Sequence, residues 1–180
     1  MGVVIELRSH IDISPSLSLQ LLQLDDAGDI WQLVQRHRAE LAKYLYWVDS
    51  VNNLATTRRY IEQRLTSELP NPHWYKIVIQ NRTAGVFGVK TINETSNCAE
   101  LGYWVSPQEQ GKGIVSSAIQ ALITELKSKQ VAHIKLDVFA ENKASQRVAE
   151  KAGAKLIAVE PNAKLANMRS KALLTYQIEL

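Results

Sequence analysis

Cysteine is almost absent from this chain, since Cys98 is the only one among 180 residues. A single cysteine excludes a disulfide within the chain and is typical of proteins from a reducing compartment, so we expect a cytoplasmic location. The four histidines, His10, His37, His73 and His133, show none of the spacings that metal ligands usually have. The sequence therefore predicts no metal site.

Long hydrophobic runs and blocks of one charge are also missing. No stretch is long and apolar enough to cross a membrane, and Glu6 and Arg8 interrupt the apolar run at the amino terminus, so we expect no secretory signal. The net charge of +3 comes from 21 basic residues interspersed with 18 acidic ones. Aromatic residues do not interleave with a basic stripe, so direct nucleic-acid binding is not expected. The mild positive charge suits an anionic ligand.

The length and the hydrophobic pattern predict one mixed α/β domain over residues 1–180. Asp25 and Asp26 are candidate caps for the first helix, and Pro70 and Pro72 are expected to end the second. The expected elements are a strand at 17–24, helices at about 30–41 and 55–69, strands at 74–80, 86–92 and 99–105 with a turn at 81–83, a helix from 112 or 113, a strand at 134–140, a helix at 143–152, and strands at 154–159 and 173–179 around a loop at 160–171.

The run QEQGKG, Gln108 to Gly113, lies between the expected strand at 99–105 and the next helix. Its two glycines are one residue apart, and the first turn of the helix contains no acidic residue, so free N–H groups and the positive end of the helix dipole meet at this loop. Such a loop suits a pyrophosphate. The run lacks the third glycine of a dinucleotide fingerprint and the Ser or Thr of a Walker loop. An ordinary strand-to-helix turn is the alternative.

Alternation along the strand before this loop assigns its residues to two faces of a sheet. Leu101, Tyr103 and Val105 are expected on one face, and Glu100, Gly102 and Trp104 on the other.

The order of these elements, with Q-x-x-G-x-G after the fourth strand, resembles the GNAT superfamily of acetyl-CoA-dependent N-acetyltransferases. The segments 41–51 (LAKYLYWVDSV) and 139–155 (FAENKASQRVAEKAGAK), with the spacing Asn142-x-x-Ser145, are similar to the Rim-type ribosomal-protein N-terminal acetyltransferases. The resemblance implies the GNAT fold: a mixed, mostly antiparallel twisted sheet of six to seven strands with four helices, ordered strand, two helices, three strands, helix, strand, helix, two strands. It also implies acetyl-CoA as co-substrate.

In that superfamily the fourth and fifth strands splay apart around the pantetheine arm. The resemblance assigns the main chain of Trp104 and Val105 to the pantetheine, and Asn142 to the pantetheine or a cofactor carbonyl. The pyrophosphate would be wrapped by the residues of the loop, namely Gln110, Gly111, Lys112, Gly113, Ile114 and Val115. The side chain of Lys112 either pairs with a phosphate or points into water, and the backbone role is favoured.

Acetyl transfer to an amine needs an unprotonated nitrogen, and an α-amino group with a reference pKa of about 7.7 to 8.0 needs less help than lysine. Glu100 is the candidate base, with a solvated or ion-paired strand residue as the alternative. The resemblance makes Ser145 the candidate hydroxyl that protonates the departing thiolate, with a helix cap as the alternative. Tyr103 and Tyr176 are reserve hydroxyls. Cys98 has no paired histidine, so direct transfer rather than an acetyl-cysteine is expected.

The acceptor is open at this point. The resemblance favours the amino terminus of a protein, with a ribosomal protein as the specific expectation; a small-molecule amine and a non-catalytic acyl-CoA-binding module are the alternatives. The oligomeric state is also open, a homodimer included. The four tryptophans, Trp31, Trp47, Trp74 and Trp104, are interpreted mainly as packing residues, with Trp47 the exception because its segment joins two helices that border the acceptor side in this superfamily.

Overall fold

The computed structural model describes residues 4–164 and 170–180. Its elements are β1 (His10–Ser14), β2 (Leu17–Leu21), the 3-10 turn η1 (Leu24–Asp26), α1 (Ala27–Leu41), η2 (Tyr46–Ser50), α2 (Leu54–Leu65), β3 (His73–Ile79), β4 (Arg82–Asn93), β5 (Cys98–Val105), η3 (Pro107–Glu109), α3 (Ile114–Ser128), β6 (His133–Phe139), α4 (Lys143–Lys151), β7 (Lys155–Ala163) and β8 (Lys171–Glu179). Among these residues, no helix combines the length and the apolar character needed to cross a membrane.

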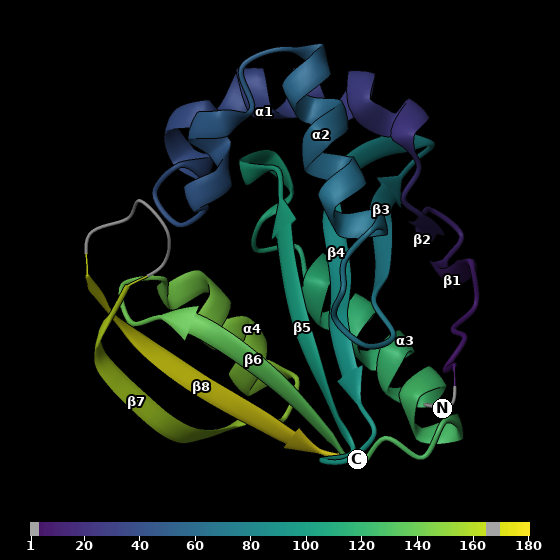
Figure 1. Cartoon of the computed structure of the whole chain (residues 1–180), viewed down its shortest axis with the longest axis vertical. Coiled ribbons are helices and arrows are strands. Elements are labelled where there is room, and N and C mark those ends of the chain that lie inside the picture. Colours follow the sequence, from purple (N-terminus) through teal and green to yellow (C-terminus); the bar gives the residue numbers. More distant parts are fainter. Residues whose placement is uncertain (1–3, 165–169) are drawn as a thin grey trace.

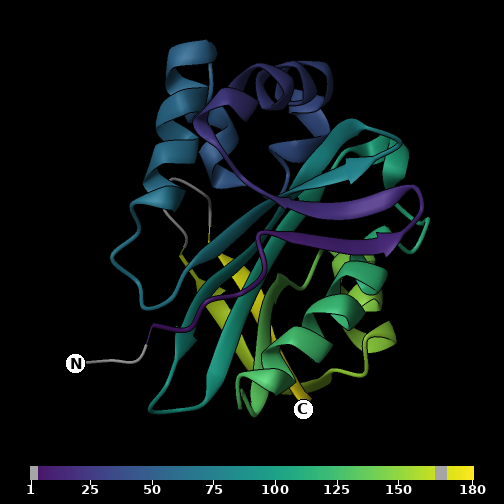
Figure 2. The ribbon, with the colours of Figure 1, turned by 90° about the vertical axis from the view of Figure 1, so that its right-hand side faces the viewer.

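The eight strands form one sheet in the order β1-β2-β3-β4-β5-β6-β8-β7. Every neighbouring pair is antiparallel except β5 and β6, which are parallel. Figures 1 and 2 show α1 and α2 together at one end of the molecule, away from both termini. The predicted mixed, mostly antiparallel sheet with four α-helices is thus confirmed.

The expected six to seven strands become eight because the segment before Pro15 forms β1. In this strand Ile11 is buried while His10 and Asp12 are exposed, which is the alternation of a strand with one face on the core. At the other end, β7 runs to Ala163, through the first part of the expected loop at 160–171. The part of that loop at 165–169 lies outside the described residues.

The hairpin between β3 and β4 is tighter than expected. Ile79 pairs with Arg82, so Gln80 and Asn81 are the two loop residues, and both have positive φ, +48° and +61°. Two loop residues with positive φ match the twist of the flanking strands, which is why the chain turns one residue before the expected 81–83.

Two helix ends also differ from the expectation. Asp26 occupies the position before α1, but its carboxylate makes no cap bond there; it accepts from the Gln23 amide and pairs with Lys76 Nζ. The second helix ends at Leu65 rather than near residue 69, and the Thr66 hydroxyl donates to a carbonyl of its last turn. The residue before Pro70 avoids the helical region, so the chain leaves the helix ahead of the prolines.

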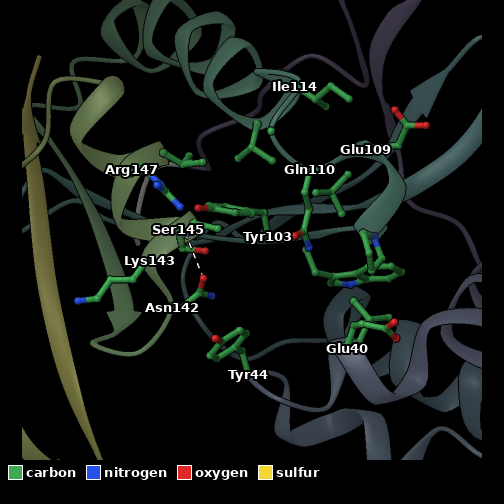
Figure 3. A pocket seen from close by; sticks show the side chains of 18 of the residues that line it. Glu40, Tyr44, Tyr103, Glu109, Gln110, Ile114, Asn142, Lys143, Ser145 and Arg147 are labelled. Carbon is green, nitrogen blue, oxygen red and sulfur yellow. Dashed lines mark hydrogen bonds between the residues drawn. The ribbon is translucent and has the colours of Figure 1, made fainter.

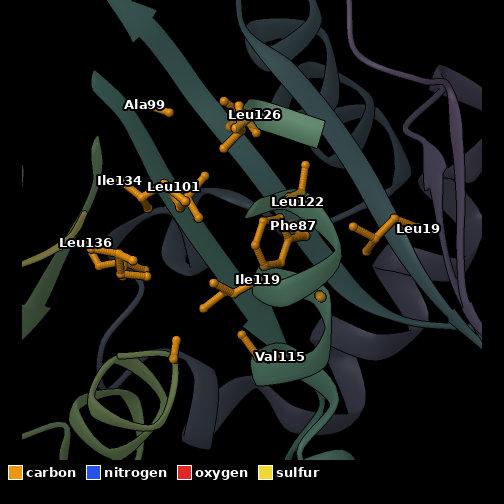
Figure 4. Close-up of a cluster of buried hydrophobic side chains, with 14 of the residues drawn as sticks. Leu19, Phe87, Ala99, Leu101, Val115, Ile119, Leu122, Leu126, Ile134 and Leu136 are labelled. Atoms are coloured by element: carbon orange, nitrogen blue, oxygen red, sulfur yellow. The ribbon is translucent and has the colours of Figure 1, made fainter. Parts of the chain in front are cut away.

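The larger hydrophobic cluster lies between α3 and one face of the sheet (Figure 4). Val115, Ile119, Leu122 and Leu126 repeat at helical spacing and contact buried strand residues, among them Phe87. This packing fixes α3, and with it the loop that leads into α3, relative to β5.

A second cluster lies on the opposite face, where α1 and α2 pack on β4 and β5. Val86 and Trp104 supply the sheet side, and Ile30, Val34 and Ile61 belong to the helices. The predicted alternation along β5 is therefore confirmed, because Leu101 and Val105 belong to the cluster under α3 and Trp104 to the cluster under α1 and α2.

Candidate active site

β5 and β6 separate partway along their length (Figure 1). Their parallel ladder has four pairs, from Cys98 with His133 to Leu101 with Leu136. Beyond Leu101, β5 continues to Val105 paired only with β4, and β6 continues to Phe139 paired only with β8. The splayed strands expected from the resemblance are present, and a gap opens between them.

The register of β4 and β5 decides which main-chain groups face this gap. The Ser106 amide donates to the Ala84 carbonyl at 2.8 Å, one step beyond the pairing of Val105 with Gly85. Because bonded and non-bonded pairs alternate in an antiparallel ladder, Trp104 bonds to β4 as Ser106 does. The N–H and C=O groups of Tyr103 and Val105 therefore point toward β6, whereas those of Trp104 are committed to the sheet.

The glycine loop reaches α3 through two residues in the left-handed region. Gly111 has φ +75° and Gly113 has φ +76°, and Gly113 is the N-cap of α3 without any side-chain cap bond. A Cβ atom added at either glycine would meet no atom within 4 Å, so both face open space. The first turn of α3 has no acidic residue. Uncapped N–H groups at the positive end of the helix dipole thus face a solvent-accessible hollow.

This hollow, which we call the glycine-loop cavity, has a volume of about 690 Å³. Besides Asn142, seven of the predicted cofactor-binding residues line it, namely Trp104, Val105, Gln110, Gly111, Gly113, Ile114 and Val115. Trp104 contributes its side chain, because its main chain is committed to β4. Lys112 is not among the lining residues, and its ammonium pairs with Glu109 at 2.9 Å. The Lys112 side chain is more than half exposed, as the alternative of a side chain in water expects, and the phosphate role of its backbone stays a prediction.

A row of basic residues on α4 forms another part of this wall. Lys143, Arg147 and Lys151 are spaced by four residues, which places them on one face of the helix, and all three line the glycine-loop cavity. Arg147 and Lys151 have no acidic partner within the described residues. This row was not among the predicted site residues, although basic residues with a period of four in a predicted helix are a signal that the sequence contains.

Asn142 and Ser145 lie where α4 begins (Figure 3). Asn142 Oδ1 accepts a hydrogen bond from the Ser145 amide at 3.1 Å, so Asn142 caps the helix and the alternative cap role of Ser145 is wrong. The Ser145 hydroxyl remains available beside the phenol of Tyr103, as the close-up shows.

Tyr103 has a buried hydroxyl, and no described residue is placed to form a good hydrogen bond with it. Burial raises the pKa of Tyr103 to about 12, and the neighbouring Ser145 side chain offsets this only in part. The contact with the Ser145 side chain falls short of good hydrogen-bond geometry, so the Tyr103 hydroxyl lacks a well-formed partner among the described residues.

A second hollow, the aromatic cavity, has a volume of about 600 Å³ and is lined by Trp47, Tyr60, Trp74 and Trp104. The Trp47 ring lies 4.2 Å from that of Tyr60 and 5.6 Å from that of Trp104, and Trp104 Nε1 donates to the Tyr60 hydroxyl at 2.9 Å. The expectation of packing residues holds for Trp104, which is 6% exposed. Trp47 and Trp74 are cavity walls as well.

The two cavities share part of their walls. Tyr44, Leu45, Tyr103, Trp104, Asn142 and Ser145 line both. The unpaired hydroxyl of Tyr103 and the hydroxyl of Ser145 therefore stand at the junction, where a group held in one cavity meets a group held in the other.

Glu100, the candidate base, lines the aromatic cavity together with Lys90. Lys90 Nζ donates to Glu100 Oε1 at 2.5 Å, and about a quarter of the Glu100 side chain is exposed, 27%. Glu100 is therefore ion-paired, as the alternative interpretation expected. Its carboxylate also lines the aromatic cavity, so the role as base stays a prediction.

Cys98, at the start of β5, lines neither cavity. Burial raises the pKa of its thiol, which makes the reactive thiolate scarcer. Tyr176, the other reserve hydroxyl, packs against the core and also lies outside both cavities.

The sequence model of the acetyltransferase (GNAT) domain family matches residues 16–155. The chain therefore belongs to the GNAT acetyltransferase family, and the splayed strands and glycine loop lie within the matched region.

Individual relatives sharpen this assignment. A ribosomal-protein-serine acetyltransferase of Escherichia coli (strain K12) is 28% identical over 114 residues, and the match covers 63% of this chain and 64% of that protein, less than two thirds of its length. The microcin C7 self-immunity acetyltransferase MccE, solved with acetyl-CoA and AMP, is 27% identical with a TM-score of 0.88 over 96% of this chain and 97% of its own. RimL, a ribosomal L7/L12 α-N-protein acetyltransferase solved with coenzyme A, is 25% identical with a TM-score of 0.87 over 95% and 98%.

Proposed function

We propose that this protein transfers the acetyl group of acetyl-CoA directly to an amine, and that the amine is the α-amino group of a protein in the cytoplasm. The single observation that carries the proposal is that two cavities of different chemistry meet at the hydroxyls of Tyr103 and Ser145. One cavity suits a phosphate-bearing carrier and the other an acceptor, as direct transfer requires.

The residues of the glycine-loop cavity fit coenzyme A. Gly111 and Gly113 leave space for close approach to free N–H groups, and Arg147 and Lys151 offer cations that no acidic residue of the described chain pairs with. The helix dipole contributes about 0.3 to 1 kcal/mol, so direct N–H and side-chain contacts must supply most of the affinity. The main chain of Tyr103 and Val105, with the amide of Asn142, would hold the pantetheine arm in the gap between β5 and β6.

Acetyl-CoA, when bound, supplies an acetyl group activated as a thioester. Tyr103 and Ser145 then donate a proton or a hydrogen bond to the departing thiolate sulfur, and the raised pKa keeps Tyr103 protonated at neutral pH. Glu100 accepts the proton from the attacking amine, directly or through water. Lys90 pairs with Glu100 in the absence of acceptor, so this uptake weakens their ion pair.

The α-amine of a ribosomal protein is the acceptor that the relatives favour, because the E. coli relative and RimL are both named for acetylation of ribosomal proteins. MccE favours a second candidate, a small-molecule amine, since its structure holds AMP and shares the fold at a similar identity. Aromatic rings that line the second cavity here are compatible with either acceptor.

Release of free coenzyme A thiol tests the proposal. Purified protein with acetyl-CoA should release thiol with one acceptor class from a panel of amino-terminal peptides, amino acids, polyamines and aminoacyl nucleotides, and mass spectrometry of the product should locate the acetyl group. Peptide α-amines are expected to react. No thiol release with any class would contradict catalysis, and reaction only of small amines would move the protein to the second candidate.

A further inference from the structure

Arg64 stands out among the charged residues that line the aromatic cavity. The others are Lys90, Glu100 and Asp137. Lys90 pairs with Glu100, and Asp137 pairs with Lys135 and accepts from the Thr175 hydroxyl. Arg64 has no acidic partner within the described residues. The cavity therefore holds one unbalanced cation.

Aromatic rings surround this guanidinium and leave its edge unsatisfied. Its carbon lies 3.4 Å from the centroid of the Tyr60 ring, 5.0 Å from that of Trp74 and 5.6 Å from that of Trp47. Rings stabilise a guanidinium through its face, whereas its five N–H donors lie in the plane. One terminal N–H bonds to the Tyr60 carbonyl at 2.9 Å, the guanidinium also contacts the Tyr60 hydroxyl, and the buried Nε has no acceptor among the described residues.

A second buried donor in the same wall also lacks an acceptor. Trp74 Nε1 has no hydrogen-bond partner among the described residues, and its ring is one of those beside Arg64. A buried donor without a partner costs free energy, which a ligand oxygen that accepts from either donor would recover. Burial also lowers the pKa of Arg64 from its ordinary value, as expected for a cation without a counter-charge.

We propose that the acceptor carries an anionic group, a carboxylate or a phosphate, which binds Arg64 and Trp74 in the aromatic cavity while the amine lies at the junction with the glycine-loop cavity. A planar fork of N–H donors matches two oxygens of either anion. The inference rests on the proposed function and narrows it. For a protein acceptor, the anion is an acidic side chain close to the amino terminus; for a small molecule, it is the molecule's own phosphate or carboxylate.

Matched acceptors test the charge. Serine-initiated hexapeptides with one Asp at position two, three or four are each compared with the Asn peptide, and O-phosphoethanolamine is compared with ethanolamine. For the wild type, kcat/KM for an acidic peptide should exceed that for its Asn partner by about tenfold or more. A preference confined to O-phosphoethanolamine also supports the anion site and assigns it to a small acceptor. Equal rates in every pair overturn the inference.

Variants test the residues. Arg64→Met should bring the ratio of acidic to neutral acceptor close to one, Arg64→Lys should keep part of it, and Trp74→Phe should lower it by a smaller factor because the ring remains. Arg59→Met is the matched control, since Arg59 is exposed on the same helix and its loss removes the same charge. An unchanged ratio in Arg64→Met, or an equal loss in Arg59→Met, would overturn the role of Arg64.

Binding without chemistry separates this inference from the proposed function. Calorimetric titration of the protein with the Asp and Asn peptides in the absence of acetyl-CoA should show tighter binding of the Asp peptide, and Arg64→Met should remove the difference. Selective binding without any thiol release would retain the anion site and contradict catalysis. Thiol release with equal binding of the Asp and Asn peptides would support catalysis and contradict the anion site.

Discussion

The two cavities have similar volumes, about 690 and 600 Å³, and are built in different ways. The glycine-loop cavity has its main-chain donors in one short stretch, the loop before α3, and other walls from the end of α1, β5 and α4. The aromatic cavity depends on side chains from η2, α2, β3 and β5, which are far apart in the chain. A carrier common to a whole family can be recognised by the backbone, whereas the acceptor has to be selected by side chains.

The charges that line the two cavities also differ, in a way that fits a carrier in the first cavity and an acceptor in the second. In the glycine-loop cavity the cations Arg147 and Lys151 lack acidic partners over residues 4–164 and 170–180, which suits several phosphates. In the aromatic cavity Lys90 pairs with Glu100 and Asp137 with Lys135, so within the part of the chain that the structure describes Arg64 is the one lining charge without an opposite charge. A change in the first cavity should therefore affect every reaction of the protein, and a change in the second should affect the acceptor or the proton.

The largest effect is expected from the carboxylate of the aromatic cavity. Glu100→Gln should lower kcat by roughly a hundredfold at about pH 6 and by less at about pH 9, because an α-amine with a pKa near 8 is protonated at the lower pH. Its affinity for coenzyme A should stay the same. The measurement is a pH profile of thiol release alongside calorimetric titration with coenzyme A.

Lys90→Met is the control for this substitution, because it breaks the same ion pair and leaves the carboxylate in place. If Glu100 acts only through the ion pair, both variants lose the same activity at every pH. That result would contradict a role as base.

The next effect belongs to the glycine-loop cavity. Gly113→Val should weaken coenzyme A binding at least tenfold, since a branched side chain at φ +76° is strained by about 1 to 2 kcal/mol and extends into open space beside the N–H groups. Gly113→Asn separates the two causes, because asparagine tolerates this backbone and still adds a side chain. Gly28→Val, at a glycine with equally open surroundings in α1 and an ordinary φ, should bind normally. Calorimetric titration measures the affinities for coenzyme A. If Gly113→Val binds coenzyme A as tightly as the wild type, the loop does not bind the pyrophosphate.

Tyr103, at the junction of the cavities, is expected to raise the rate of transfer without stabilising the fold. Tyr103→Phe should lower kcat by about tenfold, while removal of a buried hydroxyl without a partner should leave the free energy of unfolding at pH 7 unchanged or higher. The pKa of about 12 lies above the ordinary tyrosine value of 10.0, so the folded state holds this proton more tightly and the wild type loses stability as the pH rises from 10 to 12. The variant should lose less. Denaturant unfolding at about pH 7 and pH 11 measures the free energy of unfolding of both proteins and the amount each loses between the two pH values. A large loss of stability of Tyr103→Phe at pH 7 would show a structural role instead.

The sequence predicted the half of the site that local rules determine. Alternation along β5 and the glycines at 111 and 113 are local signals, and they located the strand and the loop before α3, whereas the splay of β5 from β6 was implied by the resemblance. Arg64 gave no such signal, because its neighbours Trp47 and Trp74 come from other elements and meet it only in the folded chain. The same holds for the ion pair of Glu100, whose partner Lys90 lies on the adjacent strand.

The smallest effects should separate Asn142 from Ser145 at the start of α4. Asn142→Ala removes the cap that accepts from the Ser145 amide, and should lower the free energy of unfolding by about 1 kcal/mol. Ser145→Ala keeps that amide and its bond, so its stability should stay within about 0.5 kcal/mol of the wild type while kcat falls severalfold. Denaturant unfolding and thiol release on both variants measure the two quantities. A loss of stability without loss of rate in Ser145→Ala would give Ser145 a structural role in the helix. Tyr103 would then be the donor to the departing sulfur, because its hydroxyl also lies in the wall that both cavities share and has no well-formed partner among the described residues.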